Sequence, residues 1–163
     1  MPGFNLKKYN PIVRLFEKQV EWLGLSRNAG PILAAIYISK YRDERKLNAE
    51  QIADATNYSR SNVGLVLSQL EALGLIYGEM DFSQTGRGRR RILYSVEEGS
   101  SLASLSIKKT IDRLEESIRE IDTLLVILNP ETPEMPKMLS KFKHEAEAAV
   151  SSLSELYINE RSG

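Results

Sequence analysis

Apolar residues near the start of the chain recur at helical spacing. Between Pro11 and Leu25 the apolar positions follow one another at intervals of three or four, which predicts a helix with one buried face: Ile12, Phe16, Val20 and Leu23. A second helix is predicted from Pro31 to about Tyr41, because proline suits a first helical position. Its run "ILAAIYI" is apolar nearly all round, so we expect this helix at the centre of the core.

Two short helices are predicted between Leu47 and Gly74. Asn48 followed three residues later by Gln51 has the form of a helix cap, and the helix that it starts should end near Asn57, a residue type that tolerates left-handed backbone. Ser59 is expected to cap the second helix and Gly74 to close it. The inner face of the second helix is predicted from its apolar spacing to be Val63, Leu67, Leu70 and Leu73.

Two strands are predicted after these helices. "GLIYGEM" has the composition of a strand, and "RRILYSV" predicts a returning strand with Ile92, Tyr94 and Val96 on one face. The segment between them, "DFSQTGRGR", is polar and rich in turn formers. The pattern therefore predicts a helix-turn-helix followed by a β-hairpin, with the arginines of "TGRGRRR" at its tip and on its outgoing arm.

Beyond Glu97 the chain carries two heptad stripes on either side of the proline-rich "NPETPEMP". The first comprises Ile107, Ile111, Leu114, Ile118, Ile121, Leu125 and Leu128, and the second Met135, Leu139, Phe142, Ala146, Ala149, Leu153 and Leu156. They indicate an antiparallel helical hairpin. The stripes can bury each other, but the first helix of the chain also has an apolar face, so we favour a second subunit as the partner.

The predicted fold class is mainly α with a small β-hairpin. Residues 1–97 are predicted to form a winged helix-turn-helix domain with an N-terminal dimerisation helix. Residues 98–163 are predicted to form a C-terminal helical hairpin for dimerisation.

Composition removes several classes of protein. The 163 residues include no cysteine, which excludes disulfides, thiolate metal sites and cysteine nucleophiles. The longest apolar run falls far short of the roughly 20 residues of a membrane span, and the N-terminus lacks the apolar core of a signal peptide. We therefore expect a cytoplasmic protein with no membrane partner.

A formal net charge of zero hides an asymmetry between the two predicted parts. Residues 1–97 hold 14 Lys or Arg against 10 Asp or Glu, whereas residues 98–163 hold 8 against 12. The first part is thus +4 and the second −4. The basic character lies in the part that contains the arginine run.

The second helix of the helix-turn-helix could enter the major groove of double-stranded DNA, which has a similar width. Its first residues would then face bases and phosphates: Ser59, Arg60, Ser61 and Asn62. Arg60 suits guanine and Asn62 suits adenine, unless Asn62 serves the helix start instead. Gly64 is costly inside a helix. It would either let the backbone approach DNA closely or pack against the preceding helix.

The hairpin supplies a second set of candidates. Gly86 and Gly88 give the tip backbone freedom, while neighbouring side chains could contact phosphates or a narrow minor groove: Thr85, Arg87, Arg89 and Arg90, with Arg91 as a further candidate. Such a patch would supply affinity, and the helix would supply sequence preference. The alternative is a solvated basic strand that protects a sheet edge.

The segment "LNAEQIADATNYSRSNVGLVLSQLEALGLI", followed by a hairpin ending in "RRRILYSV", resembles the winged-helix domain of the MarR superfamily, especially its GbsR-like branch. The resemblance implies a dimeric transcriptional regulator whose recognition helix starts near Ser59 and whose wing carries Arg87 to Arg90. It also implies dimerisation through the N- and C-terminal helices. Because GbsR-like members are associated with choline and glycine betaine uptake, a role in osmoprotection is a further implication.

Enzymatic activity, cofactors and metal sites are not expected. His144 is the single histidine, and "GRG" lacks the lysine of a phosphate-binding loop. The main rival function is a winged helix that binds protein without specific DNA binding. A small-molecule effector is a further alternative, because five aromatic residues could line a site for it: Tyr9, Phe16, Trp22, Tyr37 and Tyr41. Packing in the core is the favoured interpretation of these residues.

Overall fold

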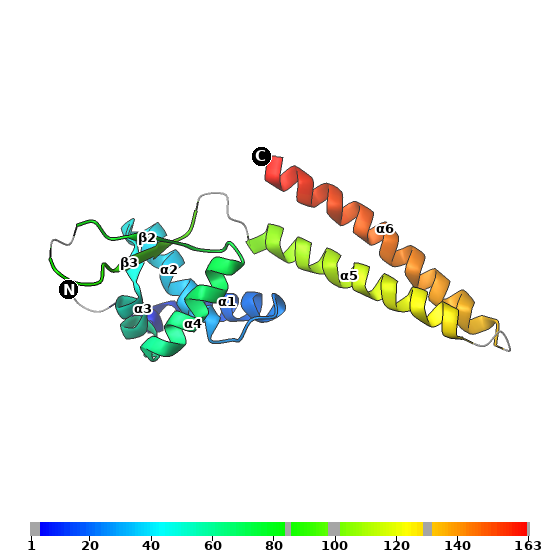
Figure 1. The fold of residues 1–163 in the computed structure, drawn as a ribbon, viewed down its shortest axis with the longest axis horizontal. Coiled ribbons are helices and arrows are strands. Elements are labelled where there is room, and N and C mark those ends of the chain that lie inside the picture. Colours follow the sequence, from blue (N-terminus) through cyan, green and yellow to red (C-terminus); the bar gives the residue numbers. More distant parts are fainter. Residues whose placement is uncertain (1–3, 84–85, 98–101, 129–131, 163) are drawn as a thin grey trace. The chain divides into compact units, whose positions relative to one another are not determined.

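The computed structural model describes residues 4–83, 86–97, 102–128 and 132–162. The chain divides into two compact units, Met1–Leu102 and Ala103–Gly163. The elements of the first unit follow a short 3₁₀ turn, Leu6–Tyr9, and are α1 (Asn10–Trp22), α2 (Ala29–Asp43), β1 (Leu47–Asn48), α3 (Ala49–Thr56), α4 (Arg60–Ala72), β2 (Tyr77–Met80) and β3 (Ile92–Ser95) (Figure 1). They are followed by α5 (Leu102–Ile127) and α6 (Glu134–Ser162).

Helix α1 is shorter than the sequence predicts and its buried face is rotated. Gly24 has φ +86°, a left-handed conformation that ends the helix at Trp22 rather than at Leu25. The prediction that Ile12 faces the core is wrong, because its side chain is 41% exposed and Val13 is buried in its place. Phe16 and Val20 are buried as predicted.

Helix α2 lies at the centre of the core, as predicted. It begins at Ala29, two residues before the predicted start at Pro31, and every residue from 29 to 36 is buried. Gly30 lets α1 come close, because a Cβ atom there would lie 2.6 Å from Cα of Glu17. The amides in the first turn of a helix have no intrahelical partner, so Pro31, as the third residue of α2, removes no hydrogen bond.

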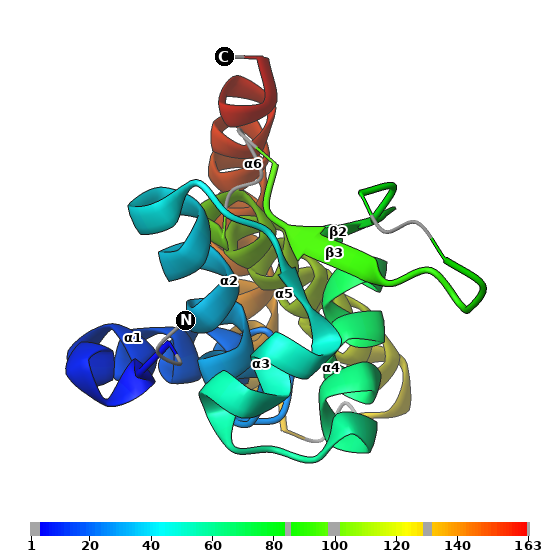
Figure 2. The same cartoon turned by 90° about the vertical axis from the view of Figure 1, so that its left-hand side faces the viewer.

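The caps of α3 and α4 are those that the sequence predicts. The Asn48 side chain accepts a hydrogen bond from the Gln51 amide at 2.9 Å, and Gln51 Oε1 accepts one from the Asn48 amide at 2.9 Å. Asn57 has φ +59°, so it turns the chain between the two helices. Figure 2 shows α3 and α4 side by side in this unit. Gly74, with φ +72°, follows the end of α4.

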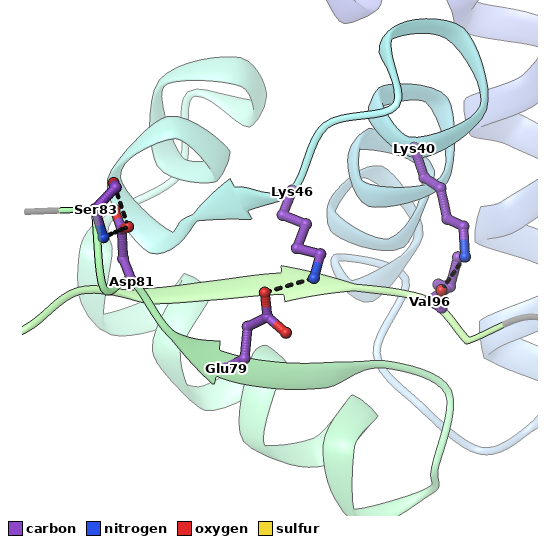
Figure 3. Close-up of polar contacts among 6 residues, drawn as sticks. All are labelled: Lys40, Lys46, Glu79, Asp81, Ser83 and Val96. Atoms are coloured by element: carbon purple, nitrogen blue, oxygen red, sulfur yellow. Dashed lines mark hydrogen bonds and ion pairs between the residues drawn. The ribbon is translucent and has the colours of Figure 1, made fainter.

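The three strands form an antiparallel sheet in the order β1-β3-β2. The pairing of Gly78 with Tyr94 and of Met80 with Ile92 sets the register of the hairpin. Strand β1 was not predicted, and it pairs Leu47 with Tyr94. Figure 3 shows two lysines that fix this sheet: Lys46 Nζ donates to Glu79 Oε1 of β2 at 2.5 Å, and Lys40 Nζ of α2 donates to the Val96 carbonyl at 2.5 Å.

The second unit is built on the two long helices α5 and α6, which run antiparallel (Figure 1). Lys143 Nζ of α6 lies 2.6 Å from Asp122 Oδ1 of α5. All seven members of the predicted α5 stripe are half-buried, but three large members of the α6 stripe are about half exposed: Met135, Phe142 and Leu156. Among the described residues, no helix is long and apolar enough to cross a membrane.

Candidate nucleic-acid interface

The first turn of α4 is held by a hydrogen bond from backbone to side chain. Ser59 has an extended backbone and its Oγ accepts from the Asn62 amide at 3.2 Å. The cap therefore uses the backbone of Asn62 and leaves its half-buried side chain outside that bond. Arg60 and Ser61 are exposed beside it, so the predicted first turn presents polar side chains to solvent.

Gly64 faces open space on α4. A Cβ atom built at this position meets no atom within 4 Å, and the backbone φ is not in the left-handed region. The alternative that Gly64 packs against the preceding helix is therefore wrong. Because Gly64 has no side chain, the backbone of α4 is uncovered on the exposed face of the helix, one turn after Arg60.

The base of the hairpin is fixed by two sets of contacts. The Asp81 amide donates to the Arg91 carbonyl at 2.8 Å, which continues the β2–β3 pairing by one step toward the arginine run. Asp81 Oδ1 accepts from the Ser83 amide at 3.0 Å and from Ser83 Oγ at 2.5 Å (Figure 3). These hydrogen bonds from Ser83, with the nearby charge of Arg91, lower the pKa of Asp81 and keep it ionised.

A hollow of about 420 Å³ lies between the start of α3, the start of α4 and the outgoing arm of the hairpin. Its lining consists of Asn48, Ala49, Glu50, Arg60, Arg89, Arg90, Arg91, Ile92 and Tyr94. Four guanidinium groups and one carboxylate give it a formal charge of +3. The fold thus gathers residues some 30 positions apart in sequence into one basic concavity.

The single carboxylate of the hollow joins its two basic sides. Glu50 Oε2 lies 3.7 Å from Arg60 Nη1 and 3.7 Å from Arg91 Nη2. All three side chains are about half exposed or more. Ion pairs this exposed add little to stability, so the principal effect of Glu50 is the negative charge that it places inside the basic hollow.

Gly78 makes room for the apolar floor of the hollow. A Cβ atom at Gly78 would lie 2.7 Å from Ile92 Cγ2 and 3.2 Å from Tyr94 Cε1. These two side chains therefore lie over β2, on the same face of β3 as the sequence predicts. Partial burial raises the pKa of the Tyr94 hydroxyl, so it stays protonated and can donate a hydrogen bond.

The remaining wing candidates lie in different surroundings. The guanidinium of Arg90 stacks over the ring of Phe82 at 5.1 Å, which orients it on the arm. Arg87 is exposed and does not line the hollow. Thr85 lies outside the described residues.

The aromatic residues considered for an effector site lie mainly against one another. Phe16 and Tyr37 have ring centroids 5.0 Å apart, and Tyr37 and Tyr41 have centroids 6.1 Å apart. Tyr9 accepts a hydrogen bond from Arg42 Nη1 at 2.9 Å, and the same guanidinium lies 4.9 Å from the ring of Phe4. The guanidinium group of Arg42 therefore already lies against the rings of Phe4 and Tyr9.

Two lining residues of the hollow and a glycine that contacts its floor were not predicted as part of the site. Glu50 carries no local sign of its pairing with arginines 10 and 41 positions further on. Asn48 was predicted only as a cap. Gly78 inside a strand is a signal that could have been used, since such a glycine often marks a close approach of another chain segment.

Comparison with known proteins identifies the fold. No family model matches the chain, and no curated protein matches it. The crystal structure of a transcriptional regulator is similar over 94% of this chain and 97% of that one, with a TM-score of 0.62 and 17% identity. The chain has a winged-helix fold. At this identity the likeness shows the fold alone, and it confirms the predicted fold class.

Two looser likenesses have TM-scores below 0.5, too low to bear on function. A mutant of MepR from S. aureus bound to an oligodeoxyribonucleotide is 22% identical, covers 85% of this chain and 92% of that one, and has a TM-score of 0.44. A MarR family regulator from Neisseria meningitidis is 18% identical, covers 91% and 93%, and has a TM-score of 0.35.

Proposed function

We propose that this chain is a sequence-specific regulator of transcription that binds duplex DNA as a homodimer. The observation that supports this best is the convergence of Arg60, at the start of α4, with Arg89, Arg90 and Arg91 of the wing in one hollow of formal charge +3. Phosphate groups on DNA would be drawn to such a concentration of guanidinium groups, because each contact releases condensed counterions.

Helix α4 and the wing have different roles in this proposal. The first turn of α4 enters the major groove, where Arg60, Ser61 and Asn62 read base edges and Ser59 contacts the backbone. Gly64 lets the helix backbone lie close to the duplex. The wing, with Thr85, Arg87, Arg89 and Arg90, grips phosphates or the adjacent minor groove and carries no sequence information of its own.

The homodimer is supported by the apolar surface of the helices outside the hollow. In α5 and α6, Ser106 is the one buried side chain among the described residues. Two helices without a buried apolar core need a further surface to pack against. A second copy would cover the half-exposed Met135, Phe142 and Leu156 together with Ile12 and Leu15 of α1. Residues 98–163 and the N-terminal helix are thus the dimerisation elements, and residues 1–97 form the DNA-binding domain.

Membership of the GbsR-like branch of the MarR superfamily is part of the proposal. It rests on the sequence of the segment from Leu47 to Tyr94, in which Asn48 and Ser59 cap the two helices. An osmoprotectant role would follow from that branch, whereas a small-molecule effector is a separate prediction from the aromatic residues of the first unit.

The experiment that tests the function is selection of bound fragments from genomic DNA with the purified full chain. The proposal expects enriched fragments that share a roughly palindromic site, with half-sites about 34 Å apart on the duplex. Capture of DNA without a shared sequence would contradict the sequence-specific part. Failure to retain any duplex in dilute buffer would favour the rival function, a winged helix that binds protein.

A further inference from the structure

A large apolar side chain stands exposed in the middle of the proposed recognition helix. Leu65 is 62% exposed, whereas Val63, Leu67 and Leu70 of the same helix are buried. With 3.6 residues in each turn, Leu65 lies on the side of α4 opposite these core residues. Its exposure is therefore set by the orientation of the whole helix.

Three neighbours of Leu65 on this side are short: Ser61 one turn before it, Gly64 beside it and Ser68 at the next turn. Gln69, four residues further on, is a longer exposed neighbour. Ser68 Oγ donates to the Gly64 carbonyl at 3.1 Å, so this hydroxyl is turned back onto its own helix. Because the space at Gly64 is also open, Leu65 projects further than its three short neighbours.

The major groove offers one apolar group to such a side chain. Each base pair presents hydrogen-bond donors and acceptors there, and only thymine adds a methyl group, at C5. A leucine that faces the groove can bury this methyl, but it has nothing to donate to a guanine or adenine edge. A charged or amide side chain at the same place would select a different base.

We propose that Leu65 is a specificity-determining residue that packs against the C5 methyl group of a thymine in each half-site. This inference rests on the proposed function, since it requires α4 to lie in the major groove. It assigns to Leu65 the recognition of one base by apolar contact, beside the polar contacts of the first turn. Leu65 lies about 6 Å along the helix from Ser61, so the thymine is a different base from those read by the first turn.

The test uses the full chain and a fragment obtained by selection. Each thymine of the site is replaced in turn by deoxyuridine, which removes only the methyl group, and the dissociation constant is measured by fluorescence anisotropy. We expect one symmetry-related pair of thymines at which the loss of each methyl weakens binding by about fourfold. Leu65→Ala should bind the thymine and deoxyuridine fragments equally well.

Met80→Ala is the matched control, because Met80 is 56% exposed on β2 and lies outside the hollow. This variant should keep the fourfold discrimination. Circular dichroism should show that Leu65→Ala is folded, since alanine favours a helix and the position is exposed.

Three results would overturn the inference. The selected half-sites could lack thymine, every thymine could be replaced without effect in the unmodified protein, or Leu65→Ala could retain the discrimination. In each case tight binding to the selected fragment would leave the proposed function standing. If the unmodified protein did not bind any duplex, the result would instead contradict the proposed function, and this inference with it.

Discussion

Glu50 Oε2 lies 3.7 Å from Nη1 of Arg60, so a carboxylate from α3 is paired with the first arginine of the proposed recognition helix. The same oxygen lies 3.7 Å from Arg91 on the other side of the hollow. DNA phosphates that enter the hollow would meet the negative charge of Glu50 as well as the four arginines. In the proposed complex, Glu50 would therefore oppose a phosphate bound in the hollow.

Glu50→Gln should strengthen binding to duplex DNA of any sequence. Removing one negative charge about 4 Å from a phosphate is worth about 1 kcal/mol in each copy at low salt, or roughly 30-fold in the affinity of the dimer. Fluorescence anisotropy with selected and scrambled duplexes measures this change. Asp54→Asn, an exposed change on the same helix outside the hollow, should leave affinity nearly unchanged. Weaker binding by Glu50→Gln would show that its positioning of Arg60 outweighs the repulsion.

Substitutions in the wing should change the affinity for DNA, whereas substitutions in α4 should change the base preference. Arg89→Ala or Arg90→Ala should weaken binding about equally on all sequences and reduce the salt slope by about two, because each substitution removes one phosphate contact from each copy of the dimer. Arg60→Ala or Asn62→Ala should instead change which bases are preferred. Parallel selections with each variant, compared with salt titrations, separate the two effects. The reverse pattern would mean that the wing reads the bases and the helix grips the backbone.

Gly64→Ala should separate stability from DNA binding. The added methyl meets open space in the free protein, so the variant should be more stable to unfolding by up to about 1 kcal/mol. It should also bind DNA more weakly, because the methyl would stand between the helix backbone and the duplex. Thermal melting and anisotropy measure the two quantities.

Gly30→Ala is the contrasting control, since its Cβ would lie 2.6 Å from the backbone of Glu17 and should destabilise the fold. A Gly64→Ala variant with higher stability and unchanged affinity would place the helix backbone away from DNA.

The local elements of the first unit could be predicted because their signals lie within a few residues. Asn48 and Gln51 satisfy each other's amides, and Asn57 and Gly74 adopt the left-handed conformations that their residue types favour. Strand β1 escaped prediction because two residues are too few to show an alternating pattern. It exists because Leu47 pairs with Tyr94, a contact between distant parts of the chain.

The candidate site was predictable by residue type but not by arrangement. The run of arginines is visible in the sequence, yet only the fold shows that Arg91 faces Glu50 while Arg87 stays outside the hollow. Ile12 and Val13 illustrate the same limit, because neighbouring apolar residues fit helical spacing almost equally well and the packing against α2 decides between them. Long-range packing determined what local spacing left open.

Phe142→Gln should weaken the proposed homodimer. Its side chain is 52% exposed on α6, and a polar amide there would lose the apolar contact expected with a second copy. Light scattering after size exclusion should show a shift toward the monomer mass of 18.4 kDa. Lys141→Gln, a neighbouring exposed position, should leave the dimer intact. A protein that is monomeric before any substitution would contradict the dimer.

The most direct test of the central claim is the salt dependence of duplex binding by the full chain. If the arginines of the hollow and wing bind phosphates in both copies of a dimer, about 6 to 10 contacts should cost about 10³ to 10⁵ in affinity between 50 and 200 mM salt. The account predicts a loss of affinity in this range, and a smaller loss over the same salt interval for Arg89→Ala. Binding that is absent in dilute buffer, or that is insensitive to salt, would contradict it.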